Sequence, residues 1–310
     1  MIYHLRRLVA VTTDLRTLAP LDKGLSRDLN MLESQPSRTA FDVAVLRAVH
    51  QIVDSPKVFD DPLAARILGS DGGNALKLAV DDAAKSARLR AMIVVRSRIA
   101  EDALTEAINR GARQYVVLGA GLDTFVYRNT GPKVHVFEVD HPATQAWKRE
   151  RLDAAGLDQP ESLNFVPIDF ERQSLRKELE RAGFRFDRPA VFTLLGVIPY
   201  VERLAVLATL GLIASSRSGN AEVVFDYAEP FADASPLVRS AYEAITMRAA
   251  AIGEPWVTFF KPDELKRELR SLGFDQIDDM DTRALNGRYF AGRTDNFAAA
   301  PLVHVVRARN

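Results

Sequence analysis

The sequence predicts an α/β fold built on a parallel, Rossmann-like sheet, and the first observation that indicates it is a short strand. Residues 115–118 are apolar or aromatic and carry no charge, which is typical of a strand buried on both faces of a parallel sheet. The strand stops at Gly119-Ala120-Gly121. Two glycines separated by one small residue let the chain turn sharply and let a ligand approach the backbone without meeting a Cβ atom.

A second strand with an acidic end supplies the other observation. Residues 134–139 are mostly apolar, and Glu138 and Asp140 stand at the end of this run, about twenty residues after the glycines. At this spacing a nucleotide-binding βαβ unit sets a carboxylate against the ribose hydroxyls. The stretch therefore predicts an adenosine site, although a lone Gly-x-Gly also occurs in ordinary strand-to-helix turns.

The residues after the glycines, where a helix is expected to begin, indicate which adenosine cofactor fits. A dinucleotide site has the pattern Gly-x-Gly-x-x-Gly, with the diphosphate at a helix N-terminus. Here Thr124 occupies the third glycine position, and Asp123 stands where it would repel a diphosphate. S-adenosylmethionine carries no phosphate, and Asp123 can hydrogen-bond its cationic ammonium group. We therefore favour S-adenosylmethionine over NAD.

Several motifs carry a resemblance to a known family. The runs VVLGAGLDTFVYR and FEVDHPATQAWKRERL resemble the S-adenosylmethionine-dependent methyltransferases related to leucine carboxyl methyltransferases. The resemblance extends from Ser37 to the C-terminus and includes RSRIAEDAL, LLGVIPYV and GEPWVTFF. It implies a class I methyltransferase fold of about seven, mostly parallel strands, a bound S-adenosylmethionine and transfer of its methyl group, with oxygen as the expected acceptor atom.

Composition limits the classes of partner. The chain has 310 residues, 47% of them hydrophobic, which suffices for one large core with appendages. Basic and acidic residues number 41 each, so no basic excess indicates a nucleic-acid partner. The lack of cysteine and the scattered histidines predict no metal site. No apolar segment is long enough to span a bilayer, and the start lacks a convincing signal peptide. We expect a cytoplasmic enzyme with a small-molecule methyl acceptor, and its oligomeric state stays open.

The residues before the first strand are expected to form helices. Residues 1–36 carry no motif and lie outside the resemblance. Ser37 is expected to cap a helix, and Asp61 a short helix over residues 63–68. In the resembling family this region closes over the cofactor and shapes the acceptor pocket, whereas simple packing on the sheet is the alternative. We expect one methyltransferase domain over residues 37–310, with a helical lid and lead-in at 37–110 and a cofactor-binding core at 111–310.

A long helix over residues 84–110 contains Arg96 and Arg98. Residues 93–95 just before them are apolar, so at least one of the two arginines needs a partner. A guanidinium grips a carboxylate with two parallel hydrogen bonds, and the methionine carboxylate of the cofactor is a suitable one. By resemblance an arginine of this helix binds there. We favour Arg96 over Arg98, and a solvated helix face is the alternative.

The third and fourth strands end in further candidates for cofactor binding. Residues 164–168 form the third strand, and by resemblance Asp169 meets the adenine amino group and Phe170 flanks the ring. A helix cap is the alternative for Asp169. At the end of the fourth strand, relatives commonly have an acidic residue where this chain has Leu195. Backbone carbonyls or another side chain, with Asp123 as a candidate, must then contact the ammonium of the cofactor.

Candidates for the acceptor side are weaker. Tyr200 lies at the predicted mouth of the site and is a candidate catalytic residue. His141 is a second candidate and also a cofactor-binding candidate, although a His-Pro pair at a helix start is typically structural. Residues 226–229, with two acids and a tyrosine, form either an acceptor-facing cluster or a solvated loop. Trp256 either lines the acceptor pocket or belongs to the core.

The remaining elements complete the sheet. A fifth strand is expected over residues 222–227, and closing strands over 276–280 and 302–308, with an irregular connection at 287–293. Helices are expected over residues 141–152, 174–182, 203–214 and 262–272. They lie between the strands, as a doubly wound sheet requires.

Methyl transfer from a sulfonium is an in-line displacement with a good leaving group, so alignment and exclusion of water are the main tasks of the protein. A carboxylate acceptor needs no base, whereas a hydroxyl does. No assembled base is visible in the motifs, which favours a carboxylate or an acidic hydroxyl. Two alternatives stay open, an NAD(P)-dependent oxidoreductase and, because of Leu195, a non-catalytic S-adenosylmethionine-binding protein.

Overall fold

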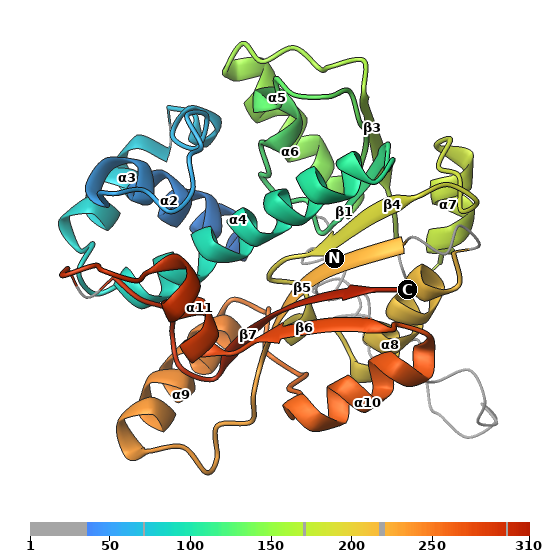
Figure 1. Cartoon of the computed structure of the whole chain (residues 1–310). Coiled ribbons are helices and arrows are strands. Elements are labelled where there is room, and N and C mark those ends of the chain that lie inside the picture. The colour runs from blue at the N-terminus through green and yellow to red at the C-terminus, as the bar shows by residue number, and fades with distance from the viewer. Residues whose placement is uncertain (1–35, 71, 170–171, 217–220, 296) are drawn as a thin grey trace, which may run out of the picture.

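The computed structural model describes residues 36–310 except 71, 170, 171, 217–220 and 296. Its centre is a seven-stranded sheet in the order β3-β2-β1-β4-β5-β7-β6 (Figure 1). The strands β1 to β5 pair in parallel, and β7 is antiparallel to both β5 and β6. The predicted fold of about seven, mostly parallel strands is confirmed. The strands are β1 Gln114–Leu118, β2 His135–Asp140, β3 Leu163–Pro167, β4 Ala190–Leu194, β5 Ala221–Ala228, β6 Gln276–Met280 and β7 Val303–Arg309.

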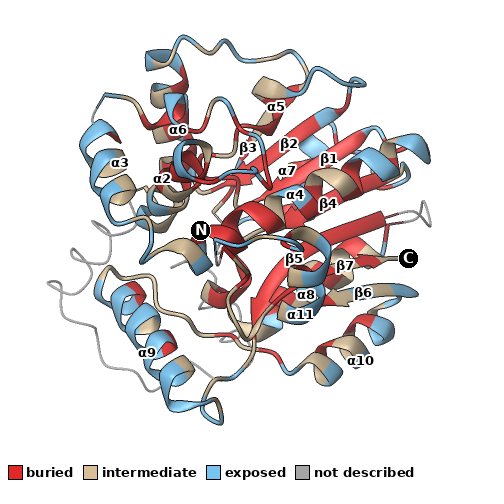
Figure 2. Cartoon of the chain, turned by 60° about the vertical axis from the view of Figure 1, so that its left-hand side comes forward, coloured by how far each residue is buried: buried red, intermediate tan, exposed pale blue. Residues whose placement is uncertain are grey.

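Helices cover both faces of the sheet. On one face, α4 (Ala87–Asn109) and α11 (Thr282–Tyr289) pack on apolar side chains of β1, β5 and β7. The other face is covered by α7 (Leu175–Arg181), α8 (Arg203–Ala214) and α10 (Pro262–Leu272). Every residue of β1 and β5 is therefore buried, as the colours of Figure 2 show for the central strands. This double covering explains why these strands are nearly continuous apolar runs in the sequence.

The N-terminal helices pack together beside the carboxyl end of β1. They are α2 (Arg38–Val53), the 3₁₀ turn η3 (Arg66–Leu68) and α3 (Gly72–Asp81), and they share an apolar cluster with Leu122. The Ser37 hydroxyl accepts the N–H of Ala40 at 3.2 Å, which confirms the predicted cap of α2. Four further elements are α5 (Phe125–Arg128), α6 (Pro142–Ala154), η4 (Ile198–Tyr200) and α9 (Pro236–Ala251).

Two local predictions were wrong. The expected irregular connection at residues 287–293 is helical as far as Tyr289, because the Asp281 carboxylate caps α11 by accepting the N–H of Ala284 at 2.8 Å. The expected short helix at residues 63–68 is reduced to the single turn η3. Among the described residues, none of the helices has the length and apolar character needed to cross a membrane.

Candidate active site

The glycine loop lies where β1 meets the first turn of α2. Both glycines have positive φ angles, 75° for Gly119 and 47° for Gly121, which favour residues without a Cβ atom. The N–H groups of Gly119 and Ala120 donate to the carbonyl of Val139 at 2.8 and 3.2 Å, so the end of β2 holds the loop. A Cβ atom at Gly121 would lie 3.1 Å from the Cβ of Ala40. The loop is thus fitted closely beneath the N-terminal helical region.

Asp140, at the end of β2, supports this loop directly. Its Oδ2 accepts the N–H of Gly121 and its Oδ1 accepts the N–H of His141, both at 2.7 Å. The side chain is buried, and these two bonds fix the carboxylate beside the glycines. Each carboxylate oxygen has a second lone pair, so Asp140 can still accept hydrogen bonds from a ligand.

The carboxylates of Glu138 and Asp123, near Asp140, make contacts elsewhere. Glu138 is fully buried and lies 2.5 Å from the Nζ of Lys148 on α6. Burial raises the pKa of Glu138 to about 7, although the Lys148 ammonium acts in the opposite direction. Asp123 accepts the N–H of Phe125 at 2.8 Å and so fixes the start of α5, a helix of one turn. Of these three acids, Asp140 is the one whose carboxylate accepts a hydrogen bond from the glycine loop.

Two further candidates flank Asp140. His141 caps α6, and its Nδ1 accepts the N–H of Ala143 at 3.3 Å. Asp169 follows β3, with its Oδ2 3.6 Å from the Nε of Arg172. The N–H of Ile168 donates to the carbonyl of Asp140 at 2.9 Å, which brings the end of β3 beside the end of β2. Phe170 lies outside the described residues.

Arg96 and Asp226 meet at the carboxyl ends of β4 and β5. The Arg96 Nη1 donates to Asp226 Oδ2 at 2.9 Å, while Asp226 Oδ1 accepts the N–H of Gly196 at 2.6 Å. A Cβ atom at Gly196, where φ is 68°, would lie 2.7 Å from the Arg96 Nη2. The guanidinium therefore lies directly against Gly196. Within the described part of the chain, its Nε and Nη2 groups have no hydrogen-bond acceptor, so one edge of the fork can receive a carboxylate.

The side chains of Leu195 and Arg98 make other contacts. Leu195 is half-buried and packs on the apolar cluster formed by α4, β5 and β7. The carboxylate nearest Gly196 thus comes from Asp226 on the adjacent strand. Arg98 is exposed, donates to Asp102 on its own helix at 2.9 Å, and is not brought to the glycine loop. One turn of α4 therefore directs Arg96 toward β5 and Arg98 toward a separate hollow.

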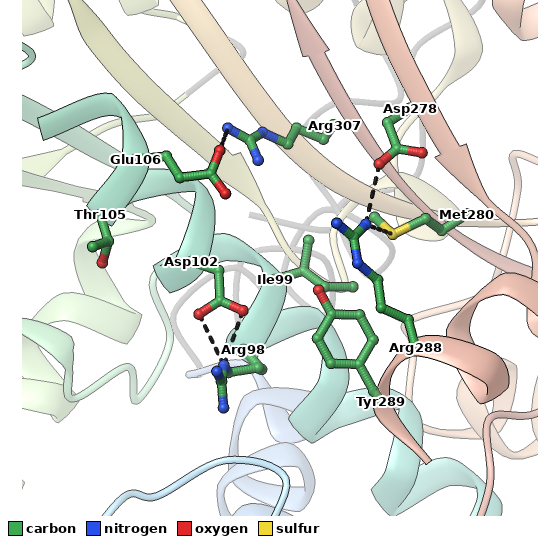
Figure 3. A pocket seen from close by; sticks show the side chains of 10 residues that line it. All are labelled: Arg98, Ile99, Asp102, Thr105, Glu106, Asp278, Met280, Arg288, Tyr289 and Arg307. Atoms are coloured by element: carbon green, nitrogen blue, oxygen red, sulfur yellow. Dashed lines mark hydrogen bonds and ion pairs between the residues drawn. The ribbon is translucent and has the colours of Figure 1, made fainter. Parts of the chain in front are cut away.

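That hollow has a volume of about 370 Å³ and lies between α4, α11 and the β6–β7 pair (Figure 3). Its arginines are paired with acids. Arg288 lies 3.4 Å from Asp278, and Arg307 lies 2.6 Å from Glu106 and also contacts Glu222. The glycines, Asp140 and Tyr200 do not line it, so it is a feature distinct from the candidate active site.

Tyr200 stands in an aromatic corner next to Arg96. Its ring meets that of Trp256 edge to face, with 6.2 Å between the centroids. Burial raises the pKa of the Tyr200 hydroxyl, the side chains of Trp256, Arg96 and Thr39 act against the rise, and Glu254 adds to it. The hydroxyl is consequently protonated at neutral pH and available as a hydrogen-bond donor.

Glu254 connects this aromatic corner to the N-terminal helical region. Its Oε1 accepts the N–H of Arg38 at 3.2 Å, and its Oε2 accepts the N–H of Thr39 at 3.1 Å, both at the start of α2. Ala40, the next residue, covers Gly121. These contacts bring the glycine loop, the start of α2, the segment around Trp256 and Tyr200 together.

Sequence reasoning missed a buried charge network behind the loop. Asp61 is fully buried, and its Oδ2 lies 2.8 Å from the Nε of Arg47 and accepts the Thr124 hydroxyl at 2.7 Å. The Nε of Arg128 lies 3.4 Å from the other oxygen of Asp61. The Asp61-Pro62 pair indicated only a helix cap, and Asp61 does accept the N–H of Leu63 at 3.1 Å. The same carboxylate also connects the N-terminal helical region to Thr124, three residues after Gly121.

The side chains of residues 226–229, for which an acceptor-facing cluster and a solvated loop were the two alternatives, divide between the two faces of the sheet. Asp226 turns toward α4, whereas Tyr227 donates to Asp279 at 2.9 Å and stacks on His304. The two ring nitrogens of His304 lie 2.8 Å from Asp279 and 3.0 Å from Glu229. Successive residues of a strand point to opposite faces, and β5 continues through Ala228, so these side chains do not form one group.

Comparisons with known proteins agree with this architecture. The family model for leucine carboxyl methyltransferase matches residues 40–214. YktD of Bacillus subtilis, assigned as an S-adenosyl-L-methionine-dependent methyltransferase, is 30% identical over 302 residues, which are 90% of this chain and 99% of YktD. A relative of the same description from Mycobacteroides abscessus is 34% identical over 170 residues, 54% of this chain and 56% of its own length.

Two solved structures share the fold. A methyltransferase structure from Thermobifida fusca superposes with a TM-score of 0.55 at 18% identity and covers 89% of this chain and 96% of its own. A duf574 family protein from Streptomyces avermitilis gives a TM-score of 0.51 at 15% identity, covering 90% of this chain and 99% of its own. At these identities the likeness concerns the fold.

Proposed function

The chain belongs to the leucine carboxyl methyltransferase family and is an S-adenosylmethionine-dependent methyltransferase, and on that premise we propose that it methylates an oxygen atom of a small molecule. The observation that supports oxygen is the chemistry of the acceptor side. Tyr200 keeps its proton at neutral pH, and the Nδ1 of His141 accepts a backbone N–H. Neither candidate is placed to deprotonate an acceptor, so one that arrives ionised, such as a carboxylate, suits this site best.

The residues at the carboxyl edge fit the cofactor. Positive φ angles at the two loop glycines and the close contact between Gly121 and Ala40 leave backbone, not side chains, facing the ligand. In this proposal Asp140 accepts hydrogen bonds from the ribose hydroxyls and the free edge of Arg96 holds the methionine carboxylate. Asp169 is assigned to the adenine edge. The bound cofactor supplies a methyl group on its sulfonium sulfur. When this group is transferred, the sulfur becomes a neutral thioether, which is the leaving group.

The chain then contributes alignment and exclusion of water. The Tyr200 hydroxyl donates a hydrogen bond that holds the acceptor oxygen in line, and Trp256 gives the pocket an apolar wall. The helical region before β1 acts as a lid, because its first turn covers Gly121 and binds Glu254. The lid must open for the cofactor to enter, and its closure removes water from the reacting atoms.

Ligand binding and product chemistry test this proposal. Thermal shift titrations are run with S-adenosylhomocysteine, NAD and NADP, because a ligand at about 100 times its Kd stabilises the native state by about 2.7 kcal/mol. We expect only S-adenosylhomocysteine to raise the melting temperature. Methyl transfer from labelled cofactor is then assayed against carboxylic acids, phenols and alcohols. A methyl ester releases methanol in mild base and a methyl ether does not.

The outcomes separate the alternatives. Stabilisation by NAD or NADP alone would identify an oxidoreductase and overturn the proposal. Binding of S-adenosylhomocysteine without transfer to any acceptor class would indicate a non-catalytic binding protein. Transfer to nitrogen or carbon acceptors alone would refute oxygen as the acceptor atom.

A further inference from the structure

We infer that Asp226 is a positioning residue that replaces, from β5, the carboxylate that β4 lacks at Leu195, and that its charge adapts the site to a cationic cofactor. The inference rests on the proposed function and concerns the same site. It starts from the two hydrogen bonds of Asp226, one to the Arg96 Nη1 and one to the Gly196 N–H. A single carboxylate thereby fixes the position of the Arg96 guanidinium and the backbone of the turn after β4.

The geometry around Gly196 leaves little freedom. The guanidinium lies so close to this residue that a Cβ atom would come within 2.7 Å of Nη2, and the φ angle of 68° itself favours glycine. Because Asp226 also accepts a hydrogen bond from Nη1, both the turn at Gly196 and β5 restrict the position of the guanidinium. Its remaining edge then points in a defined direction.

The charges supply the second argument. S-adenosylmethionine carries a sulfonium, an ammonium and a carboxylate, so its net charge is positive. Arg96 alone would attract the carboxylate but repel the two cationic groups. With Asp226 at 2.9 Å the pair is neutral overall, and both side chains are about nine-tenths buried, so solvent screens their charges little. Removal of the Asp226 charge should therefore penalise a ligand with a cationic sulfur position more than one with a neutral thioether.

Asp123, the acid considered from the sequence, is a weaker candidate for this role. Its carboxylate accepts the N–H of Phe125 and fixes the start of α5. The contacts of Asp226, by contrast, are with the residue that directly follows Leu195. The missing acid of β4 is thus compensated by the strand beside it.

Two ligands that differ in charge at the sulfur position test the inference. S-adenosylhomocysteine has a neutral thioether there, and sinefungin has a protonated amine. D226N preserves the shape of the side chain and removes its charge. Calorimetry should show that this substitution lowers the affinity for sinefungin about tenfold more than the affinity for S-adenosylhomocysteine. R96Q should have the opposite effect and lower the affinity for S-adenosylhomocysteine more than that for sinefungin, because it leaves the negative charge of Asp226 unbalanced. D102N, in the exposed Arg98–Asp102 pair of the same helix, should leave both affinities unchanged.

Each result decides the matter. Equal weakening of both ligands in D226N and in R96Q would mean that the pair only supports the fold, and unchanged affinities would remove it from the site. If D226N does not fold, the reversed ratio in R96Q decides alone. Failure of the wild-type protein to bind either ligand would instead overturn the proposed function.

Discussion

Gly121 and Ala40 touch across the site: a Cβ atom on the glycine would stand 3.1 Å from the Cβ of the alanine. The contact joins the glycine loop after β1 to the first turn of the N-terminal helical region. It requires a residue without a Cβ on one side and a small residue on the other. The start of α2 and the glycine loop therefore constrain each other's residues.

Gly121→Ala is expected to weaken binding of S-adenosylhomocysteine while the fold survives. The substitution places a Cβ at a φ of 47° and against Ala40, so the loop must shift away from Asp140. Calorimetry and thermal unfolding measure the two effects. The control is Gly73→Ala in α3, where nothing lies within 4 Å of the added atom, and this variant should bind as the wild type does. Undiminished binding by Gly121→Ala would contradict the assignment of the loop.

Asp140→Ala is expected to weaken the binding of S-adenosylhomocysteine by about 1 to 3 kcal/mol. The substitution removes charge-assisted hydrogen bonds to the ribose and leaves the N–H of Gly121 without its acceptor. Asp140→Asn keeps one acceptor oxygen and should lose less. Calorimetry with adenosine as a second ligand localises the effect. An affinity for adenosine that does not change would show that Asp140 does not act on the ribose.

Asp61→Ala is expected to lower the free energy of unfolding by about 3 to 5 kcal/mol, because Arg47 and Arg128 lose a buried carboxylate. Urea unfolding measures the change. Its neighbour provides the control: Asp60 is exposed and 3.3 Å from Lys57, so Asp60→Ala should change the free energy by less than about 0.5 kcal/mol. Similar values for both variants would mean that the buried network does not stabilise the fold.

His304 should make stability depend on pH. Burial lowers its pKa, but Asp279 and Glu229 outweigh burial, so the pKa is raised above 6.5. A raised pKa means that the folded state binds the proton more tightly. The resulting stabilisation is complete below the unfolded-state pKa and is lost as the pH rises through the folded-state value.

The difference in unfolding free energy between wild type and His304→Gln should therefore be larger near about pH 6 than near about pH 9. Urea unfolding at both pH values measures it. His135→Gln alters an exposed histidine at the start of β2 and serves as the control. A difference that stays constant with pH would show that the two carboxylates do not hold the imidazolium.

The sequence predicted the centre of the sheet well because the central strands are buried on both faces. β1 and β5 lie within one residue of their expected bounds, and α8 and α10 agree at both ends. The glycine turn and Asp140 were also visible, since their spacing follows from a single βαβ unit. These features depend on residues close together in the chain.

The partners of the charged residues could not be predicted in the same way. Arg96 and Asp226 are 130 positions apart, and no local pattern indicates that β5 would place its acid beside α4. Asp61 carries the signal of a helix cap and gives no sign of its contact with Thr124. Tyr227 and Asp226 are adjacent in sequence but face opposite sides of the sheet. Such pairings arise only when distant segments pack.

The Asp61 network also bears on chimeric enzymes made from this family. Its acid comes from the helical region, whereas Thr124 and Arg128 come from the segment after the glycines. Exchanging residues 37–86 between relatives would transplant half of a buried ion cluster and leave the other half unmatched. A recombined enzyme of this kind would have to inherit both halves from one parent, so the N-terminal helices and the glycine loop would be selected together.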